Sequence, residues 1–104
     1  MSLTSKQRAQ LRGMASTEDT IVHIGKGGIG INENVIKQVE DALRARELIK
    51  GSVLENSPIS AREACDQLAE ICRAEPVQVI GRKFVLYKRN EKEPKIVLVK
   101  ESKK

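Results

Sequence analysis

A short apolar segment followed at once by a cluster of glycines limits the folds open to this chain more than any other feature. Residues 20–24, Thr-Ile-Val-His-Ile, are mostly β-branched, as in a strand. Residues 25–30, Gly-Lys-Gly-Gly-Ile-Gly, are too rich in glycine for a regular element. Asn32 then offers a helix N-cap, and apolar residues follow it at helical spacing. The sequence therefore predicts a strand, a glycine-rich loop and a helix in immediate succession.

Three helices are predicted from capping patterns and apolar periodicity. Residues 4–7 and 60–63 both fit a capping box, so helices are expected over 4–15 and over 61–72. The helix after Asn32 presents its apolar side chains on one face. The predicted buried positions of the three helices are Leu3, Leu11 and Met14; Val35, Ile36, Val39, Ala42 and Leu43; and Ala61, Ala64, Cys65, Leu68, Ile71 and Cys72.

Three further strands are predicted, over residues 47–54, 76–80 and 83–88. Gly81-Arg82 separates the last two, so these are expected to form a hairpin. Gly51 lies inside its strand and indicates a bulge or a close approach of another chain segment. Residues 96–99 are predicted to form either a short edge strand or part of a tail.

The predicted order of elements is α-β-α-β-α-β-β. Two βα units give parallel strands, and the final hairpin adds an antiparallel pairing. We therefore expect an α/β fold, a two-layer sandwich with a mixed sheet of about four strands. The chain has 104 residues, which is the usual length of one domain. We expect a compact core over about residues 3–90 and a basic tail over 91–104.

The charge of the chain is positive and unevenly placed. The net charge is +5, yet residues 1–15 hold three Lys or Arg and no acid, and residues 82–104 hold nine Lys or Arg and three Glu. Clustered positive charge on a small domain is typical of proteins that bind polyanions. No apolar run is long enough to cross a membrane and no signal peptide is recognised, so a soluble cytoplasmic protein is expected.

The residues that could carry metal or nucleophilic chemistry are few. The chain has two cysteines and one histidine, which is too few for a usual metal site. Cys65 and Cys72 are seven residues apart in a predicted helix, about 10.5 Å along its axis, too far for a disulfide. Both are predicted to be small core residues, and His23 to be a residue of the sheet surface. We therefore expect no enzyme activity, no metal and no cofactor.

Two interpretations of the glycine-rich loop as a phosphate site remain open at this point. Gly25, Gly27 and Gly30 match the G-x-G-x-x-G fingerprint of dinucleotide sites, and Glu47 follows at about the distance of the ribose-binding acid. Against it, Glu47 stands at the start of its strand rather than the end. Alternatively, residues 25–28 form a GxxG clamp on a nucleic-acid backbone. A module that binds another protein is a third possibility.

Four stretches taken together resemble the CRM domain family in its stand-alone, YhbY-like form. They are Lys6-Gln7-Arg8 with Leu11-Arg12; residues 24–29, Ile-Gly-Lys-Gly-Gly-Ile; residues 46–50, Arg-Glu-Leu-Ile-Lys; and residues 77–82 with 85–87, Val-Gln-Val-Ile-Gly-Arg and Val-Leu-Tyr. The resemblance implies an RNA-binding module similar in fold to the C-terminal domain of a translation initiation factor. It also implies a role in maturation of the large ribosomal subunit.

The resemblance turns the loop into a predicted RNA contact. It implies that the GxxG loop, Gly25 to Gly28, contacts RNA. The expected RNA is ribosomal RNA, free or within a pre-ribosomal particle. Basic residues outside the loop are predicted to extend this surface. The full set of predicted RNA-binding residues is Gly25, Lys26, Gly27, Gly28, Lys6, Arg8, Arg12, Arg82, Lys83, Lys88 and Arg89.

Overall fold

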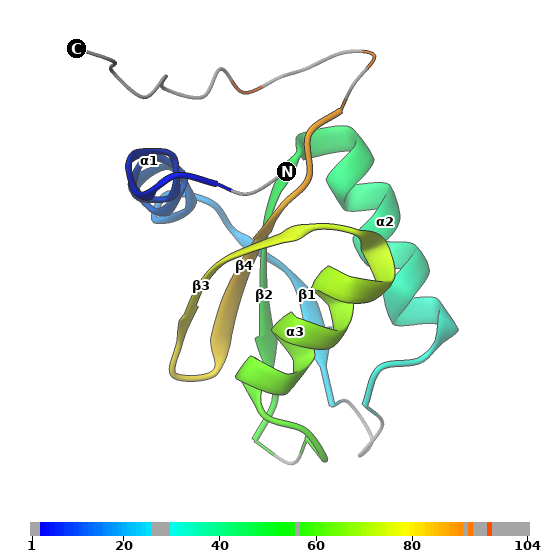
Figure 1. The fold of residues 1–104 in the computed structure, drawn as a ribbon. Helices are drawn as coiled ribbons and strands as arrows, with labels where there is room; N and C mark the ends of the chain where they lie inside the picture. The colour runs from blue at the N-terminus through cyan, green and yellow to red at the C-terminus, as the bar shows by residue number, and fades with distance from the viewer. Residues whose placement is uncertain (1–2, 26–29, 56, 91, 93–95, 97–104) are drawn as a thin grey trace, which may run out of the picture.

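The computed structural model describes residues 3–25, 30–55, 57–90, 92 and 96. Its elements follow the predicted order α-β-α-β-α-β-β (Figure 1). They are α1 (Ser5–Ala15), β1 (Thr20–Ile24), α2 (Glu33–Arg46), β2 (Leu48–Val53), α3 (Ala61–Cys72), β3 (Glu75–Ile80) and β4 (Lys83–Tyr87). No helix in this part of the chain has the length and apolar character needed to cross a membrane.

The four strands form one mixed sheet in the order β1-β2-β4-β3. β1 and β2 pair in parallel, which places the two βα units as predicted. β4 is antiparallel to both β2 and β3, so the predicted hairpin is present. The strands β2 and β4 therefore lie in the interior of the sheet and β1 and β3 at its edges, as Figure 1 shows.

Local capping explains where the helices begin. The Thr4 hydroxyl accepts the Gln7 backbone N–H, and the Gln7 side chain accepts the Thr4 N–H in return. Ser60 and Glu63 make the same reciprocal pair before α3, and the Asn32 side chain accepts the Val35 N–H before α2. Each cap satisfies backbone donors that a helix start leaves unpaired, so the short-range sequence signals were sufficient to locate these ends.

Both faces of the sheet are covered, each by its own core. On one face, α2 and α3 pack on alternate residues of the strands, among them Ile49, Phe84 and Leu86. On the other face, α1 packs on the intervening residues, among them Leu48, Val85 and Tyr87. Figure 1 shows α1 on the opposite side of the sheet from α2 and α3. The predicted sandwich is thus joined by a third, partial layer.

The contact of Gly51 with Phe84 brings the two interior strands together. A Cβ atom on Gly51 would lie 2.4 Å from Cζ of Phe84, closer than real atoms approach. Phe84 is fully buried, so its ring occupies the space that a side chain on β2 would need. The β1–β2 register also shifts beside Gly51, between Thr20 and Val22. Of the two alternatives predicted for Gly51, the close approach is confirmed, whereas the irregularity of the ladder lies in the facing strand β1.

A few predicted positions were wrong. Met14 and Ile71 are exposed by 37% and 47%, because the buried side of α1 runs through Leu11 and Ala15 and that of α3 through Leu68, Ala69 and Cys72. β2 begins one residue later than predicted because Glu47 has φ +65° and serves as the C-cap of α2. Residues 97–99 lie outside the described part of the chain, so the proposed edge strand there stays a prediction.

We predict that Gly51→Ala destabilises the fold by roughly 1–3 kcal/mol, because the new methyl group overlaps the Phe84 ring. The matched control is Gly13→Ala in α1, where nothing lies within 4 Å of the new atom. That variant should be stabilised by about 0.5–1 kcal/mol, the usual gain of alanine over glycine in a helix. Urea denaturation of both variants measures the two changes; equal stabilities would contradict the Gly51–Phe84 constraint.

Candidate nucleic-acid interface

The glycine-rich loop and the β3–β4 turn leave the same end of the sheet. Two consecutive residues of the β2 end hold them: the Val53 N–H donates to the Arg82 carbonyl at 2.8 Å, and the Leu54 N–H donates to the Ile24 carbonyl at 2.7 Å. The end of β1 and the β3–β4 turn both lie at the lower end of the sheet in Figure 1. The structure thus places Arg82, which is exposed, at the same end of the sheet as the start of the loop.

Gly25 is required by both backbone conformation and space. It has φ +105°, which side chains rarely allow, and a Cβ on it would lie 2.6 Å from Cβ of Ser57. Gly25 is also buried, so it fixes the path of the chain into the loop rather than presenting an open phosphate contact. Lys26, Gly27 and Gly28, the rest of the predicted clamp, lie outside the described residues.

On the α1 side of the sheet, the half nearer to the β3–β4 turn carries polar and basic residues. Strand register places these residues in two rows. The first runs across the sheet from Ile80 to Lys83, Ser52 and His23, and the second from Gln78 to Val85, Lys50 and Thr20. His23 Nδ1 lies 3.2 Å from the Ser52 hydroxyl, so the histidine is a sheet-surface residue, as predicted.

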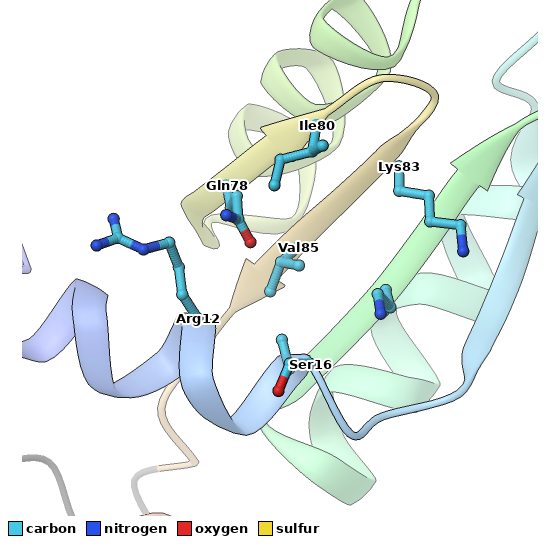
Figure 2. Close-up of a pocket in the computed structure, with 8 residues that line it drawn as sticks. Arg12, Ser16, Gln78, Ile80, Lys83 and Val85 are labelled. Carbon is cyan, nitrogen blue, oxygen red and sulfur yellow. The ribbon is translucent and has the colours of Figure 1, made fainter.

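These rows and the end of α1 enclose an open hollow of about 380 Å³. Three cationic residues line it, Arg12, Lys50 and Lys83, and none of the lining residues is acidic. Figure 2 shows Arg12 and Ser16 on the α1 side, and Gln78, Ile80, Lys83 and Val85 along the hairpin. The other lining residues are Ala15 and Lys50. The hollow is therefore a positively charged concave surface with an apolar floor.

The C-terminal end of α1 would by itself disfavour an anion in the hollow, because helix carbonyls carry partial negative charge. Here most of those carbonyls are engaged. The Ser16 hydroxyl donates to the Gly13 carbonyl at 2.7 Å, and the Thr17 hydroxyl donates to that of Met14 at 3.0 Å. The Ser16 and Glu18 backbone N–H groups donate to the Arg12 and Ala15 carbonyls. The local field is therefore set by the side-chain cations.

The opposite face of the molecule has a mixed charge. The helices α2 and α3 together contain six acidic and four basic residues, whereas α1 contains three basic residues and no acid. Arg44 on α2 lies 3.3 Å from Asp41, and Arg46 lies 3.6 Å from Glu18. The α1 face therefore has a stronger attraction for a polyanion than the α2–α3 face.

The predicted basic residues do not all belong to this surface. Lys88 and Arg89 follow the end of β4 that is remote from Lys83, about 17 Å away at strand spacing. Lys88 follows Tyr87, whose side chain belongs to the α1 core, so strand alternation directs Lys88 toward the other face of the sheet. The structure does not bring Arg82, Lys83, Lys88 and Arg89 together in the expected single patch, because the length of β4 separates the two pairs.

Along α1, the predicted basic residues also differ in position. Arg12 lines the hollow, and Arg8 lies one turn earlier on the same side of the helix, half-buried. Lys6 is exposed but lies about 160° around the helix from Arg8. Of the seven predicted basic residues outside the loop, the hollow brings together Arg12 and Lys83, and Arg82 lies in the turn just before Lys83.

Sequence reasoning missed Lys50, the third cation of the hollow. It stands in the middle of interior strand β2, between Thr20 and Val85, and is half-buried. No ion pair to it is found among the described residues. A lysine at an interior strand position facing away from the main core was the available signal, but only the folded structure shows that it lines the same hollow as Arg12 and Lys83.

Glu47 is engaged inside the protein and so cannot serve as the ribose-binding acid of a dinucleotide site. Its carboxylate accepts the Asn90 N–H and the Ile96 N–H, each at 2.6 Å, and the residue is fully buried. Its backbone carbonyl also accepts the Lys88 N–H at 2.8 Å. Glu47 therefore joins the α2–β2 junction to the chain that leaves β4, and the dinucleotide interpretation loses its acid.

The chain matches the family model described as the CRS1 / YhbY (CRM) domain over residues 3–88. It belongs to this family. The match runs from the residue before the Thr4 cap to the residue after β4, so it includes every element of the fold. The family predicted from the four sequence stretches is thereby confirmed.

Relatives of this CRM domain carry names that refer to RNA. It is 43% identical over 96 residues to the probable RNA-binding protein YqeI of Bacillus subtilis, covering 92% of this chain and 98% of the relative. It is 35% identical to a probable RNA-binding protein of Methanocaldococcus jannaschii, covering 98% and 75%. The solution structure of a Staphylococcus aureus protein, described as a candidate RNA-binding protein, is 46% identical with a TM-score of 0.75, covering 94% and 100%.

The cysteines of this CRM domain are free, buried and placed in the main core, as predicted. Burial raises the pKa of the Cys65 thiol to about 11, with a smaller contribution from Asp66. Burial also raises the pKa of Cys72, with Glu40 acting in the same direction. Because the thiolate is the reactive form, neither position favours nucleophilic chemistry. The described residues contain no group of three or more His, Cys, Asp or Glu placed to hold a metal.

We predict slow modification of these thiols in the native protein. With a pKa about two units above the ordinary 9.0, Cys65 has roughly a hundredfold less thiolate at pH 8. Labelling of Cys72→Ala by a chromogenic disulfide should therefore be at least that much slower in the folded protein than in guanidinium. The native rate should rise with pH up to about 11. A native rate equal to the denatured rate would show an accessible, reactive thiol.

Proposed function

We propose that this CRM domain is an RNA-binding protein without catalytic activity of its own. The observation that carries the proposal is the meeting of Arg12, Lys50 and Lys83 around one acid-free hollow. Phosphate neutralisation by such side chains supplies most of the affinity for nucleic acid. The RNA-binding names of the relatives support RNA as the polyanion.

The proposed contact surface includes the glycine-rich loop. Backbone N–H groups of Gly27 and Gly28, with the Lys26 ammonium, would bind backbone phosphates, while Gly25 sets the course of the loop. Arg82 lies at the same end of the sheet as the start of the loop, since both are hydrogen-bonded to the end of β2. Arg8 and Arg12 extend the surface along α1, and Lys6 adds a peripheral positive charge. The loop, the hairpin turn and α1 would thus contact one RNA together.

The finer proposal is that the RNA is ribosomal, within a precursor of the large subunit. Crosslinking in cells followed by sequencing of the bound RNA tests it directly. Enrichment of large-subunit ribosomal RNA, together with co-sedimentation with precursor particles, is the expected result. Enrichment of other RNAs alone would leave RNA binding in place and remove the ribosomal assignment. Association that survives nuclease treatment would instead point to a protein partner.

We predict a strong dependence of RNA affinity on salt. About four phosphate contacts would lower the affinity roughly a hundredfold between 50 and 200 mM salt, since each contact releases condensed counterions. Filter binding with a structured ribosomal RNA fragment, repeated over a salt series, measures the slope. An affinity that hardly changes would contradict the electrostatic contacts of the α1 face.

We predict that Lys26→Asp with Gly27→Asp lowers RNA affinity by tenfold or more, because two carboxylates would replace a cation and a donor site beside the phosphates. The control is Arg44→Glu with Gln67→Glu, which changes the charge by the same three units on the α2–α3 face. The control should retain most of the affinity, and both proteins should keep their melting temperatures. Equal loss in both variants would remove the loop from the site.

A further inference from the structure

The hollow beside α1 has an apolar floor as well as a positively charged rim. Phosphate binding alone does not account for the apolar floor. Ile80 is 62% exposed, the most exposed of the large apolar residues in the described chain. Val85 and Ala15 also line the hollow. An apolar surface between cations matches a ligand that has a flat apolar face attached to an anionic group.

The rim carries cations from three separate elements. Arg12 comes from the last turn of α1, Lys50 from β2 and Lys83 from β4. Register places Lys83 beside Ser52 and Lys50 beside Val85, so the two lysines project from neighbouring rows of the same face. The side chain of Lys83 extends toward β2 in Figure 2. An anion above the apolar floor can therefore be contacted by cationic side chains from more than one side.

Lys50 is a half-buried cation that an anionic ligand would suit. It is half-buried in an interior strand, and the described residues provide no carboxylate within ion-pair distance. Partial burial of an unpaired ammonium costs free energy that an anionic partner would recover. Gln78, half-buried in the same row across Val85, offers an amide donor and acceptor beside it.

The shape of the hollow distinguishes between forms of RNA. In a duplex, base faces are hidden in the stack and a protein meets only the backbone and groove edges. In a single strand, a base can turn out and place its face on a side chain. The volume of about 380 Å³ lies within the range of sites that enclose a small ligand. The apolar floor, in which Ile80 is exposed and the buried Val85 contributes part of the lining, is therefore complementary to an unstacked nucleotide.

We infer that the hollow formed by Arg12, Lys50, Gln78, Ile80, Lys83 and Val85 is a subsite for one unstacked nucleotide of single-stranded RNA. The base lies against Ile80 and Val85, with Gln78 at its edge. Its phosphates lie against Lys50, Lys83 and Arg12. The inference rests on the proposed RNA binding and adds a preference that the glycine-rich loop alone does not imply.

The test compares an unstructured RNA with a blunt RNA hairpin of the same number of nucleotides, whose two strands are joined by a non-nucleotide linker so that it has no unpaired bases, by fluorescence anisotropy. The variant is Lys50→Gln with Lys83→Gln, and the matched control is Lys37→Gln with Arg62→Gln, exposed on the α2–α3 face. The hollow variant should lose about tenfold or more in affinity for the unstructured RNA, as expected for lost charge-assisted contacts, and little for the hairpin. Its salt slope should fall by about 1.4, for two lost single-strand phosphate contacts.

A second variant separates base contact from charge. Ile80→Ser removes an exposed apolar side chain without changing charge, so the fold should persist. It should lower the affinity for the unstructured RNA several-fold and leave the salt dependence of that affinity unchanged. In the wild type, titration with the unstructured RNA should shift the methyl resonances of Ile80 and Val85, while the hairpin should not.

The outcomes distinguish this inference from the proposed function. Equal losses for both RNAs would make the lysines general phosphate contacts and overturn the subsite. No loss for either RNA, with the wild type binding normally, would also overturn it. A wild type that binds only the hairpin would remove the subsite and leave the proposed function standing. A wild type that binds neither RNA would refute the proposed function itself.

Discussion

The seat of Phe84 against the backbone of Gly51 is the contact on which the rest of this structure depends. It lets the interior strands β2 and β4 lie side by side with a full ring between their main chains and the helices α2 and α3. Once the register of this pair is set, every other residue of β4 turns toward α1, and Val85 and Tyr87 form the second core. One glycine therefore determines which side chains each face of the sheet presents.

The candidate site follows from the incomplete cover of the second face. Leu11 and Ala15 bury the upper part of that face, and α1 ends there. The rows below remain open, and their residues are cationic and polar, with Ile80 and Val85 among them. A helix one or two turns longer would cover these rows with backbone. The position where α1 stops thus converts part of a core surface into a binding surface.

The sequence predicted well what depends on neighbouring residues. Both capping boxes, the bounds of β1 and the hairpin follow from signals a few residues apart. Three features depend on distant pairing and were not predictable in that way. Lys50 lines the same hollow as Lys83 only because of strand register, the Glu47 carboxylate accepts from Asn90 and Ile96 far along the chain, and Lys88 lies beyond the opposite end of β4 from Lys83. The similarity to an initiation-factor domain stays a prediction.

The two consecutive amides at the end of β2 have a consequence for how a ligand is held. Because Val53 and Leu54 secure the hairpin turn and the start of the loop, the two attachment points keep a fixed separation. A polymer that contacts one is presented to the other at high effective concentration, provided that the spacing of its phosphates matches. This end of the sheet would then favour RNA whose backbone curves so that its phosphates reach both points. RNA that can reach only one of them would bind less tightly.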